Sequence, residues 1–236
     1  DRGIRGIVIS LKNCFKSITR PVFYKTPDGQ ERGVVQTGGG VKLSYLAKFV
    51  ARYGLAGIEK LVGIPGSVGG SVAMNAGAEG AEISQVLRSI KFMTLDGEIK
   101  TYSKNELVFA YRKTTFPSKD GIVIEAELDL EKGETSAIYR EMDKYLSRRG
   151  STQPLTMPNS GSIFKNPDGE KAGRLIELAG LKGCRIGGAS VSIKHANFIV
   201  NKGGALAEDV IRLIKHIQTV VEEKTSVKLE QEIIVI

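Results

Sequence analysis

The chain has 236 residues, of which 41% are hydrophobic and 25% are charged, and these proportions are typical of a folded globular protein. Its formal net charge at pH 7 is +8, but lysines and arginines are spread along the chain, so anionic small molecules explain the charge as well as nucleic acid does. No stretch approaches the roughly 18 consecutive apolar residues of a transmembrane helix, and no signal peptide is visible, which excludes a membrane-spanning helix.

Cysteine and histidine are both scarce. Cys14 and Cys184 are far apart in the sequence and match neither a disulfide framework nor a zinc motif. This cysteine usage favours a reducing compartment, so we expect a cytoplasmic protein. Two histidines, His195 and His216, leave little material for a metal site, and we expect none. His195 is more readily interpreted as a hydrogen-bonded structural residue.

The first half of the chain predicts mostly strands. Short apolar runs bounded by turn residues predict strands at residues 7–9, 22–24, 33–35, 90–95, 98–102 and 122–130. Apolar residues at helical spacing predict a helix that begins near Ser44, a candidate N-cap, and ends at Gly54. A capping box between Ser103 and Glu106 predicts one further short helix.

The second half predicts a mixture of helices and strands. A helix is predicted over residues 138–146 and is expected to stop at Gly150. The polar, proline-containing run at residues 151–160 is the best candidate for a domain boundary. Beyond it the pattern predicts helices at residues 172–178 and around 210–221, and strands at residues 189–193, 198–200 and 227–236. Because the two kinds of element do not alternate regularly, the expected fold class is α+β.

The densest motif is the glycine-rich stretch from Gly63 to Gly80, GIPGSVGGSVAMNAGAEG. Glycines let the backbone approach a ligand closely, and successive N–H groups can bind an anion. The stretch contains neither the dinucleotide fingerprint G-x-G-x-x-G nor the P-loop pattern. From the glycines alone, a tight packing loop is as good an interpretation as a ligand site.

Residues 63–83, GIPGSVGGSVAMNAGAEGAEI, resemble the flavin-binding segment of the UDP-N-acetylenolpyruvoylglucosamine reductase (MurB) family. Further motifs follow in the family's order: Ala110-Tyr111-Arg112, Gly161-Ser162-Ile-Phe-Lys165-Asn166-Pro167 and Leu229-Glu230-Gln-Glu232. Residues 185–201, RIGGASVSIKHANFIVN, are similar to the family's substrate-domain signature. The short interval between Arg112 and Ser162 resembles the compact subclass. Several motifs in one order are far more specific than a single glycine loop.

This resemblance implies an enzyme that uses FAD and NADPH to reduce the enolpyruvyl ether of UDP-N-acetylglucosamine to UDP-N-acetylmuramate for peptidoglycan synthesis. The implied partners are the UDP-sugar substrate and NADPH, with no nucleic acid, no membrane and no obligate protein partner.

The resemblance also implies an α+β architecture related to vanillyl-alcohol oxidase. An FAD-binding domain is expected at residues 1–151, an inserted α/β substrate-binding domain at residues 152–226, and a C-terminal strand at residues 227–236 that returns to the FAD domain. In the family a pyrophosphate-binding segment precedes the sequence that begins here at Asp1. We therefore expect the N-terminal part of the FAD-binding domain to be largely missing from this chain.

Three catalytic residues are implied. Arg112 would hold the substrate carboxylate, because a guanidinium can grip a carboxylate with two hydrogen bonds. Ser162 would donate the proton, and Glu232 would polarise the intermediate. Alternate residues of the predicted last strand, from Glu230 to Ile236, share one face, so a partly buried Glu232 with a raised pKa is expected. A charge that protects an edge strand is the competing interpretation for Glu232.

The resemblance extends to binding residues. Cofactor-binding residues are implied at Gly63, Ile64, Pro65, Gly66, Ser67, Gly69, Gly70, Asn75, Gly77 and Ile122. Substrate-binding residues are implied at Tyr111, Lys165, Asn166 and Lys194. For the two lysines, a solvated surface position is an equally good interpretation on residue type alone.

Two alternative functions stay open. One is another FAD-dependent oxidoreductase of the same binding fold with a different substrate, which the Ser162 motif and residues 194–196 disfavour. The other, from a different class, is a basic nucleic-acid-binding module, which only the net charge supports.

Overall fold

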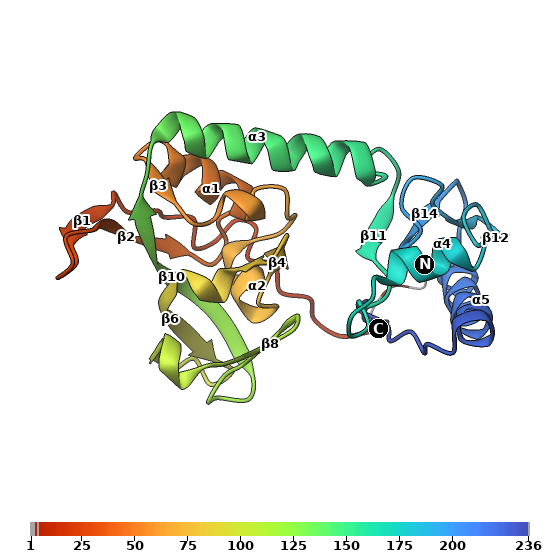
Figure 1. The fold of residues 1–236 in the computed structure, drawn as a ribbon. Helices are drawn as coiled ribbons and strands as arrows, with labels where there is room; N and C mark the ends of the chain where they lie inside the picture. Colours follow the sequence, from red (N-terminus) through yellow and green to blue (C-terminus); the bar gives the residue numbers. More distant parts are fainter. Residues whose placement is uncertain (1–2, 4, 236) are drawn as a thin grey trace. The chain divides into compact units, whose positions relative to one another are not determined.

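The computed structural model describes residue 3 and residues 5–235. The chain divides into two compact units (Figure 1). The N-terminal unit is Val8–Ser147, and the C-terminal unit is Arg148–Ile236 with the short segment before Val8. Each unit has a hydrophobic core of its own. Within the described residues, no helix combines the length and the apolar content that crossing a membrane requires.

An antiparallel sheet with the order β1-β2-β10-β6-β7 is the centre of the N-terminal unit. Its strands are β1 (Val22–Lys25), β2 (Glu31–Gly38), β6 (Leu87–Thr94), β7 (Ile99–Ser103) and β10 (Gly121–Lys132), and the short β3 (Leu55–Ala56) pairs with the end of β10. These strands confirm the predictions at residues 22–24, 33–35, 90–95, 98–102 and 122–130. The period-two pattern of β10 decides its orientation, since Ala126, Leu128 and Leu130 are fully buried on one face.

Helices supply the rest of the first core. Buried side chains of α1 (Leu43–Ala51), α2 (Val68–Ala73) and α3 (Thr135–Thr152) join the apolar face of the sheet in one cluster. The connections contain the short helices η1 (Glu59–Leu61), η2 (Ile83–Gln85) and η3 (Lys104–Glu106), and the hairpins β4 (Gly77–Ala78) with β5 (Ala81–Glu82) and β8 (Val108–Ala110) with β9 (Lys113–Thr115). The capping box predicted at Ser103–Glu106 is present at η3.

The C-terminal unit combines a four-stranded antiparallel sheet with two helices. The sheet order is β11-β14-β13-β12, with β11 (Asn159–Ser162), β12 (Arg185–Ile186), β13 (Ala189–Val191) and β14 (Phe198–Asn201). The helices are α4 (Ala172–Leu178) and α5 (Ala207–Thr225). One stripe of α5, including Ile214, Ile217 and Val221, is buried in the second core as its spacing predicts. Both units therefore confirm the α+β fold class.

Two predicted helix boundaries are wrong by a few residues. Helix α1 begins at Leu43 after Lys42, so Ser44 lies inside it. Helix α3 does not stop at Gly150 but continues to Thr152. The Ser151 and Thr152 hydroxyls donate to the Arg148 carbonyl at 2.9 and 2.8 Å. These side chains, which follow Gly150, thus bond a backbone carbonyl in the last turn of the helix.

Two predicted strands are not formed. Residues 7–9 have exposed side chains, with Ile7 92% exposed, and their apolar run does not pair as a strand within the described residues. At residues 227–235 the chain makes a single bridge, between Gln231 and Phe164, instead of a regular strand. Ile236, which was predicted to share a face with Glu232, lies outside the described residues.

The last segment belongs to the C-terminal unit. Leu229 is buried in the second core, and the Glu232 N–H donates to the Ile163 carbonyl at 2.8 Å. Its apolar anchor and this backbone hydrogen bond are thus made with neighbours in the C-terminal unit.

Candidate functional site

The glycine-rich loop of the N-terminal unit lies against the turn that follows β2. Val68 N–H donates to the Val41 carbonyl at 2.8 Å, and Leu43 N–H donates to the Gly66 carbonyl at 3.1 Å. Ser67 is the N-cap of α2, and its hydroxyl accepts a hydrogen bond from Gly70 N–H at 3.3 Å. These bonds fix the loop as one wall of a cavity.

This cavity has a volume of about 1180 Å³ and lies entirely within the N-terminal unit. Its lining includes five of the residues predicted to bind the cofactor: Pro65, Gly66, Ser67, Gly70 and Ile122. The cations Lys12, Lys16 and Lys42 line it as well. No sequence motif predicts these lysines, because the fold of residues 8–45 places them at the cavity.

The walls fit a large cofactor that has an apolar ring system and a diphosphate, and FAD is a cofactor of this kind. Gly66 has a φ of +122°, which L side chains rarely adopt, and no atom lies within 4 Å of the place where a Cβ would stand. At Gly70 a Cβ would meet only the Ser67 hydroxyl, at 3.5 Å. Both glycines thus present bare backbone to the cavity, and the lysines supply cations that suit phosphate oxygens.

The other predicted cofactor residues lie away from this wall. Gly69 is buried, and a Cβ there would lie 2.7 Å from the Val123 carbonyl oxygen, so the absence of a side chain lets α2 approach β10 closely. Ile64 packs against the first core beside Gly63. Asn75 and Gly77 support a different element, the hairpin that carries Arg112.

Tyr111 and Arg112 form the tip of the β8–β9 hairpin. Arg112 is held at a φ of +55°, and its guanidinium lies over the Tyr111 ring at 4.7 Å from the ring centre. Asn75, which is only 1% exposed, donates to the Ala110 carbonyl at 3.2 Å and so fixes the base of the tip. A Cβ at Gly77 would lie 3.2 Å from Arg112 Nη1. The structure thus brings these four predicted residues together within the N-terminal unit.

A second group of predicted residues comes together in the C-terminal unit. Ser162 ends β11 opposite Phe198 and is half-buried. Lys165 N–H donates to the Glu230 carbonyl at 2.9 Å, and the two side chains form an ion pair. The backbone bond between Glu232 and Ile163 places the predicted acid beside the residue that follows Ser162.

Two predicted substrate-binding residues have structural bonds as well. The side-chain Oδ1 of Asn166 accepts a hydrogen bond from Ala172 N–H at 3.1 Å, which satisfies a free donor at the start of α4. Lys194 lies on the loop between β13 and β14, and its ammonium group donates to the Gly150 carbonyl. Its neighbour His195 is half-buried, and burial is the main cause that lowers its pKa below the usual value of 6.5.

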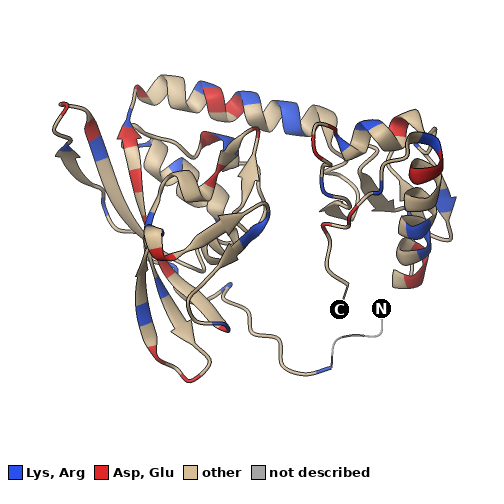
Figure 2. Cartoon of the chain, turned by 60° about the horizontal axis from the view of Figure 1, so that its bottom comes forward, with Lys and Arg blue, Asp and Glu red and all other residues tan. Residues whose placement is uncertain are grey.

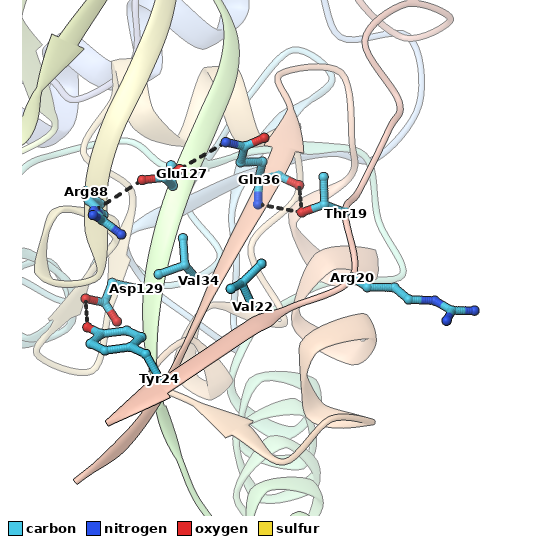
Figure 3. A pocket seen from close by; sticks show the side chains of 9 residues that line it. All are labelled: Thr19, Arg20, Val22, Tyr24, Val34, Gln36, Arg88, Glu127 and Asp129. Carbon is cyan, nitrogen blue, oxygen red and sulfur yellow. Dashed lines mark hydrogen bonds and ion pairs between the residues drawn. The ribbon is translucent and has the colours of Figure 1, made fainter. Parts of the chain in front are cut away.

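A further cavity of about 680 Å³ lies over the other, solvent-facing side of the large sheet (Figure 3). Three of its charged side chains, those of Arg88, Glu127 and Asp129, already have partners within the cavity. Arg88 pairs with Glu127 at 3.3 Å, and the Tyr24 hydroxyl donates to Asp129 at 2.7 Å. That hydrogen bond is the main cause that raises the pKa of Tyr24. None of the predicted site residues lines this cavity.

Charge distribution and metal-ligand geometry add two observations. Basic and acidic residues are mixed along α3 and on the strands of the large sheet (Figure 2). This mixture does not favour a nucleic-acid-binding module, which needs basic residues gathered on one face. Among the described residues, no three His, Cys, Asp or Glu side chains are grouped so that they could hold a metal ion.

Comparison with known proteins matches both halves of the chain. Residues 2–103 match the family described as FAD binding domain, and residues 153–236 match the family described as UDP-N-acetylenolpyruvoylglucosamine reductase, C-terminal domain. The chain is 45% identical to UDP-N-acetylenolpyruvoylglucosamine reductase of Bacillus licheniformis over 237 residues, which covers 100% of the chain and 75% of the relative.

Two other matches agree. UDP-N-acetylenolpyruvoylglucosamine reductase 2 of Symbiobacterium thermophilum is 43% identical over 233 residues, 99% of the chain and 72% of the relative. The crystal structure of UDP-N-acetylenolpyruvylglucosamine reductase (MurB) from Thermus caldophilus superposes with a TM-score of 0.74 at 41% identity, over 84% of this chain and 71% of that one. With a flavin-domain match, a reductase-domain match and relatives of this identity over its whole length, the chain belongs to the UDP-N-acetylenolpyruvoylglucosamine reductase family.

Proposed function

We propose that this protein reduces the enolpyruvyl ether of UDP-N-acetylglucosamine to UDP-N-acetylmuramate at the expense of NADPH, with FAD as its cofactor. In the net reaction, a hydride and a proton add across the vinyl double bond. The observation that carries the proposal is the 43–45% identity to reductases of this family over 99–100% of the chain, and the segments around Arg112, Ser162 and Glu232 resemble motifs of that family.

The cavity bounded by the glycine-rich loop is the proposed FAD site. When bound there, FAD supplies the hydride that NADPH provides. The bare backbone at Gly66 and Gly70 would face the cofactor, and Lys12, Lys16 and Lys42 would neutralise its diphosphate.

Arg112 is proposed to hold the substrate carboxylate. A left-handed conformation costs a non-glycine residue about 1–3 kcal/mol, and such strain persists where the surroundings determine it. Here the Asn75 hydrogen bond to Ala110 and the stack on Tyr111 supply those surroundings. A guanidinium held in this way can grip the carboxylate as negative charge moves toward it, and Tyr111 would contact the same substrate.

Ser162 is proposed to donate the proton to the carbon beside the carboxylate. A hydroxyl is a weak acid in water, so this role needs a fixed geometry. Ser162 has that geometry because its segment is bonded on both edges, to β14 and to the segment that contains Glu232. Glu232 is proposed to polarise the intermediate, while Lys165, Asn166 and Lys194 bind the diphosphate of the UDP-sugar.

The domain roles follow from these assignments. The N-terminal unit is proposed as the FAD-binding domain, and residues 152–226 of the C-terminal unit as the substrate-binding domain. We also propose that the enzyme acts in the cytoplasm on a UDP-sugar and NADPH, without nucleic acid.

The test is a direct assay of the flavin-loaded protein. NADPH oxidation should depend on UDP-N-acetylenolpyruvoylglucosamine, and the product should be heavier than the substrate by two hydrogen atoms in mass spectrometry. UDP-N-acetylglucosamine, which lacks the vinyl group, is the matched control. NADPH consumption that is equally fast with the control, or without any UDP-sugar, would contradict the proposal.

A further inference from the structure

The segment that carries Ser162 and Lys165 is bonded along both edges by backbone groups. On one edge, Glu232 N–H donates to the Ile163 carbonyl at 2.8 Å and Lys165 N–H donates to the Glu230 carbonyl at 2.9 Å. On the other edge, Ile163 N–H donates to the Asn197 carbonyl at 2.9 Å. The segment therefore behaves as the middle strand of a short three-stranded arrangement, although β11 itself ends at Ser162.

In this arrangement the Asn197 side chain, and not a backbone group, pairs with the backbone of Phe164. The Asn197 carboxamide oxygen accepts from Phe164 N–H at 3.0 Å, and its NH2 group donates to the Phe164 carbonyl at 2.8 Å. Asn197 is 4% exposed and Phe164 is 1% exposed, so water does not replace these bonds. A carboxamide offers the same donor and acceptor as a peptide group, and Asn197, which immediately precedes β14, thereby extends the pairing ahead of the start of that strand.

The same residue is tied to the loop that carries Lys194. Asn197 N–H donates to His195 Nδ1 at 3.3 Å. The Ser192 hydroxyl accepts from the Lys194 and His195 N–H groups at 3.1 and 3.3 Å, which closes the loop into a compact turn. A displacement of Asn197 would therefore be felt at the Ser162–Lys165 segment and at the Lys194 loop together.

We propose that Asn197 is a positioning residue for the reduction, whose buried carboxamide clamps the backbone of Phe164 and thereby sets the place of Ser162 and Lys165. This inference rests on the proposed function, because it assigns Ser162 a part in the reaction. Asn197 does not itself touch the reacting atoms in this account. Asn197 acts through its hydrogen bonds to the N–H and the carbonyl of Phe164, which lies between Ser162 and Lys165.

The first test separates the two half-reactions of the flavin-loaded full chain. Asn197→Asp keeps the size and the acceptor but loses the donor to the Phe164 carbonyl. Reoxidation of the reduced flavin by the enolpyruvyl substrate should slow by roughly tenfold or more, since small displacements of a reacting group cost up to about a hundredfold. Reduction of the flavin by NADPH should stay within about twofold of wild type, because the N-terminal unit retains all its contacts.

Asn201→Asp is the matched control. Asn201 is the last residue of β14, the strand that follows Asn197, and its side chain accepts from Gly203 and Ala205 N–H at 2.8 and 3.2 Å instead of bonding the Ser162 segment. It should leave both half-reactions close to wild type. Equal slowing of both half-reactions by Asn197→Asp, or equal slowing by the two aspartate variants, would overturn the proposal.

A double-mutant cycle asks whether Asn197 acts through Ser162. In a Ser162→Ala background, Asn197→Asp should slow reoxidation much less than it does in wild type, because the group that it positions has been removed. A purely structural contribution would give additive effects, and additivity would overturn the proposal.

Hydrogen exchange supplies a readout that does not depend on activity. In Asn197→Ala, which removes the acceptor of Phe164 N–H together with the donor to the Phe164 carbonyl, the amide of Phe164 should exchange faster than in wild type, while amides of the large sheet keep their protection. Unchanged protection of Phe164 would overturn the assignment of the clamp. If Ser162→Ala alone fails to slow reoxidation, the role proposed for Ser162 is wrong, and faster exchange at Phe164 would still support Asn197 as the residue that holds this segment.

Discussion

Asn75 and Glu82 are joined by a 2.7 Å hydrogen bond between the carboxamide nitrogen and the carboxylate, next to the hairpin that carries Arg112. The same nitrogen reaches the Ala110 carbonyl, and the carboxamide oxygen accepts from Ser84 N–H at 3.4 Å. One buried side chain thus links the end of the glycine-rich stretch, the η2 turn and the β8–β9 hairpin. Asn75 therefore supports the hairpin rather than the wall of the cofactor cavity.

Asn75→Ala should destabilise the N-terminal unit by about 1–3 kcal/mol, because it leaves buried polar groups without partners. FAD affinity should change much less than stability, since Asn75 does not line the cavity. Urea unfolding and flavin titration of the same variant measure the two quantities. A large loss of FAD affinity with unchanged stability would instead make Asn75 a cofactor ligand.

Two adjacent glycines of α2 should respond in opposite ways to alanine. Gly70→Ala adds a methyl group to the cavity wall, so it should weaken FAD binding by at least about tenfold, or about 1.4 kcal/mol. It should not destabilise the flavin-free protein, because alanine is about 0.5–1 kcal/mol better than glycine within a helix. Flavin titration and thermal melting of the flavin-free protein check both statements.

Gly69→Ala is the counterpart. Its new Cβ would stand 2.7 Å from the Val123 carbonyl oxygen, so it should cost about 1–3 kcal/mol of stability through overpacking. Similar stability in the two variants would show that α2 can move away from β10, and the structural role given to Gly69 would be wrong.

Arg112→Lys keeps the positive charge but loses the planar fork and the stack on Tyr111. We expect kcat/KM for the enolpyruvyl substrate to fall by roughly tenfold or more while flavin reduction by NADPH is retained. Stopped-flow measurement of both half-reactions distinguishes the effects. If NADPH reduction suffers as much as substrate reduction, Arg112 serves the flavin or the fold.

Ser162→Ala should preserve folding, FAD binding and flavin reduction by NADPH, yet slow turnover of the enolpyruvyl substrate by about 10²–10⁴-fold, the usual contribution of a general acid. Ser162→Cys, which keeps a dissociable proton, should recover part of the rate. Pre-reduced enzyme mixed with substrate reports the step directly. Turnover of the alanine variant within a few-fold of wild type would leave water or Glu232 as the proton donor.

His195 should make the C-terminal unit less stable in mild acid. Burial first, and the nearby Lys182 charge second, lower its pKa below the usual 6.5, while Glu177 acts in the opposite direction. The unfolded chain then binds the proton more readily, so stability falls as the pH drops below about 6.5 toward the lower pKa of the folded protein.

Denaturant unfolding at a series of pH values checks this prediction. His195→Gln should lose less stability than wild type between pH about 7.5 and about 5.5. His216→Gln, at an exposed position of α5, is the matched control. Parallel curves for wild type and His195→Gln would show that the burial of His195 has no effect on stability.

The elements with strong local signals are those that the sequence predicts well. Strand β10 alternates apolar and acidic residues from Ile124 to Glu131, and the Asp96-Gly97 turn fixes the β6–β7 hairpin, so both can be predicted without knowledge of a partner. The pattern at residues 227–236 is equally strand-like, yet a strand needs a neighbour over several residues, and residues 227–235, the part that the structure describes, form only the bridge at Gln231. The alternation of apolar and polar residues within one segment does not show how long the neighbouring strand is.

The candidate site is predictable only where residues near in sequence act together. Ser162 and Lys165, or Tyr111 and Arg112, are found from one motif each. Lys42 and the other cavity lysines are not, because packing of the chain places them opposite the glycine-rich loop. Asn197 meets Phe164 across 33 positions, so its clamp has no local signal at all.

The paired charges on the outer face of the large sheet have a consequence for errors during folding. Glu125, Glu127 and Asp129 alternate with the buried residues of β10 and bond cations on neighbouring strands, such as Lys91 at 2.9 Å. If β10 slipped by one residue against its neighbours, every side chain would change faces, and three carboxylates would enter the apolar core without their cations. The acidic row therefore acts as a lock on strand alignment, which penalises misaligned sheets far more than it stabilises the aligned one.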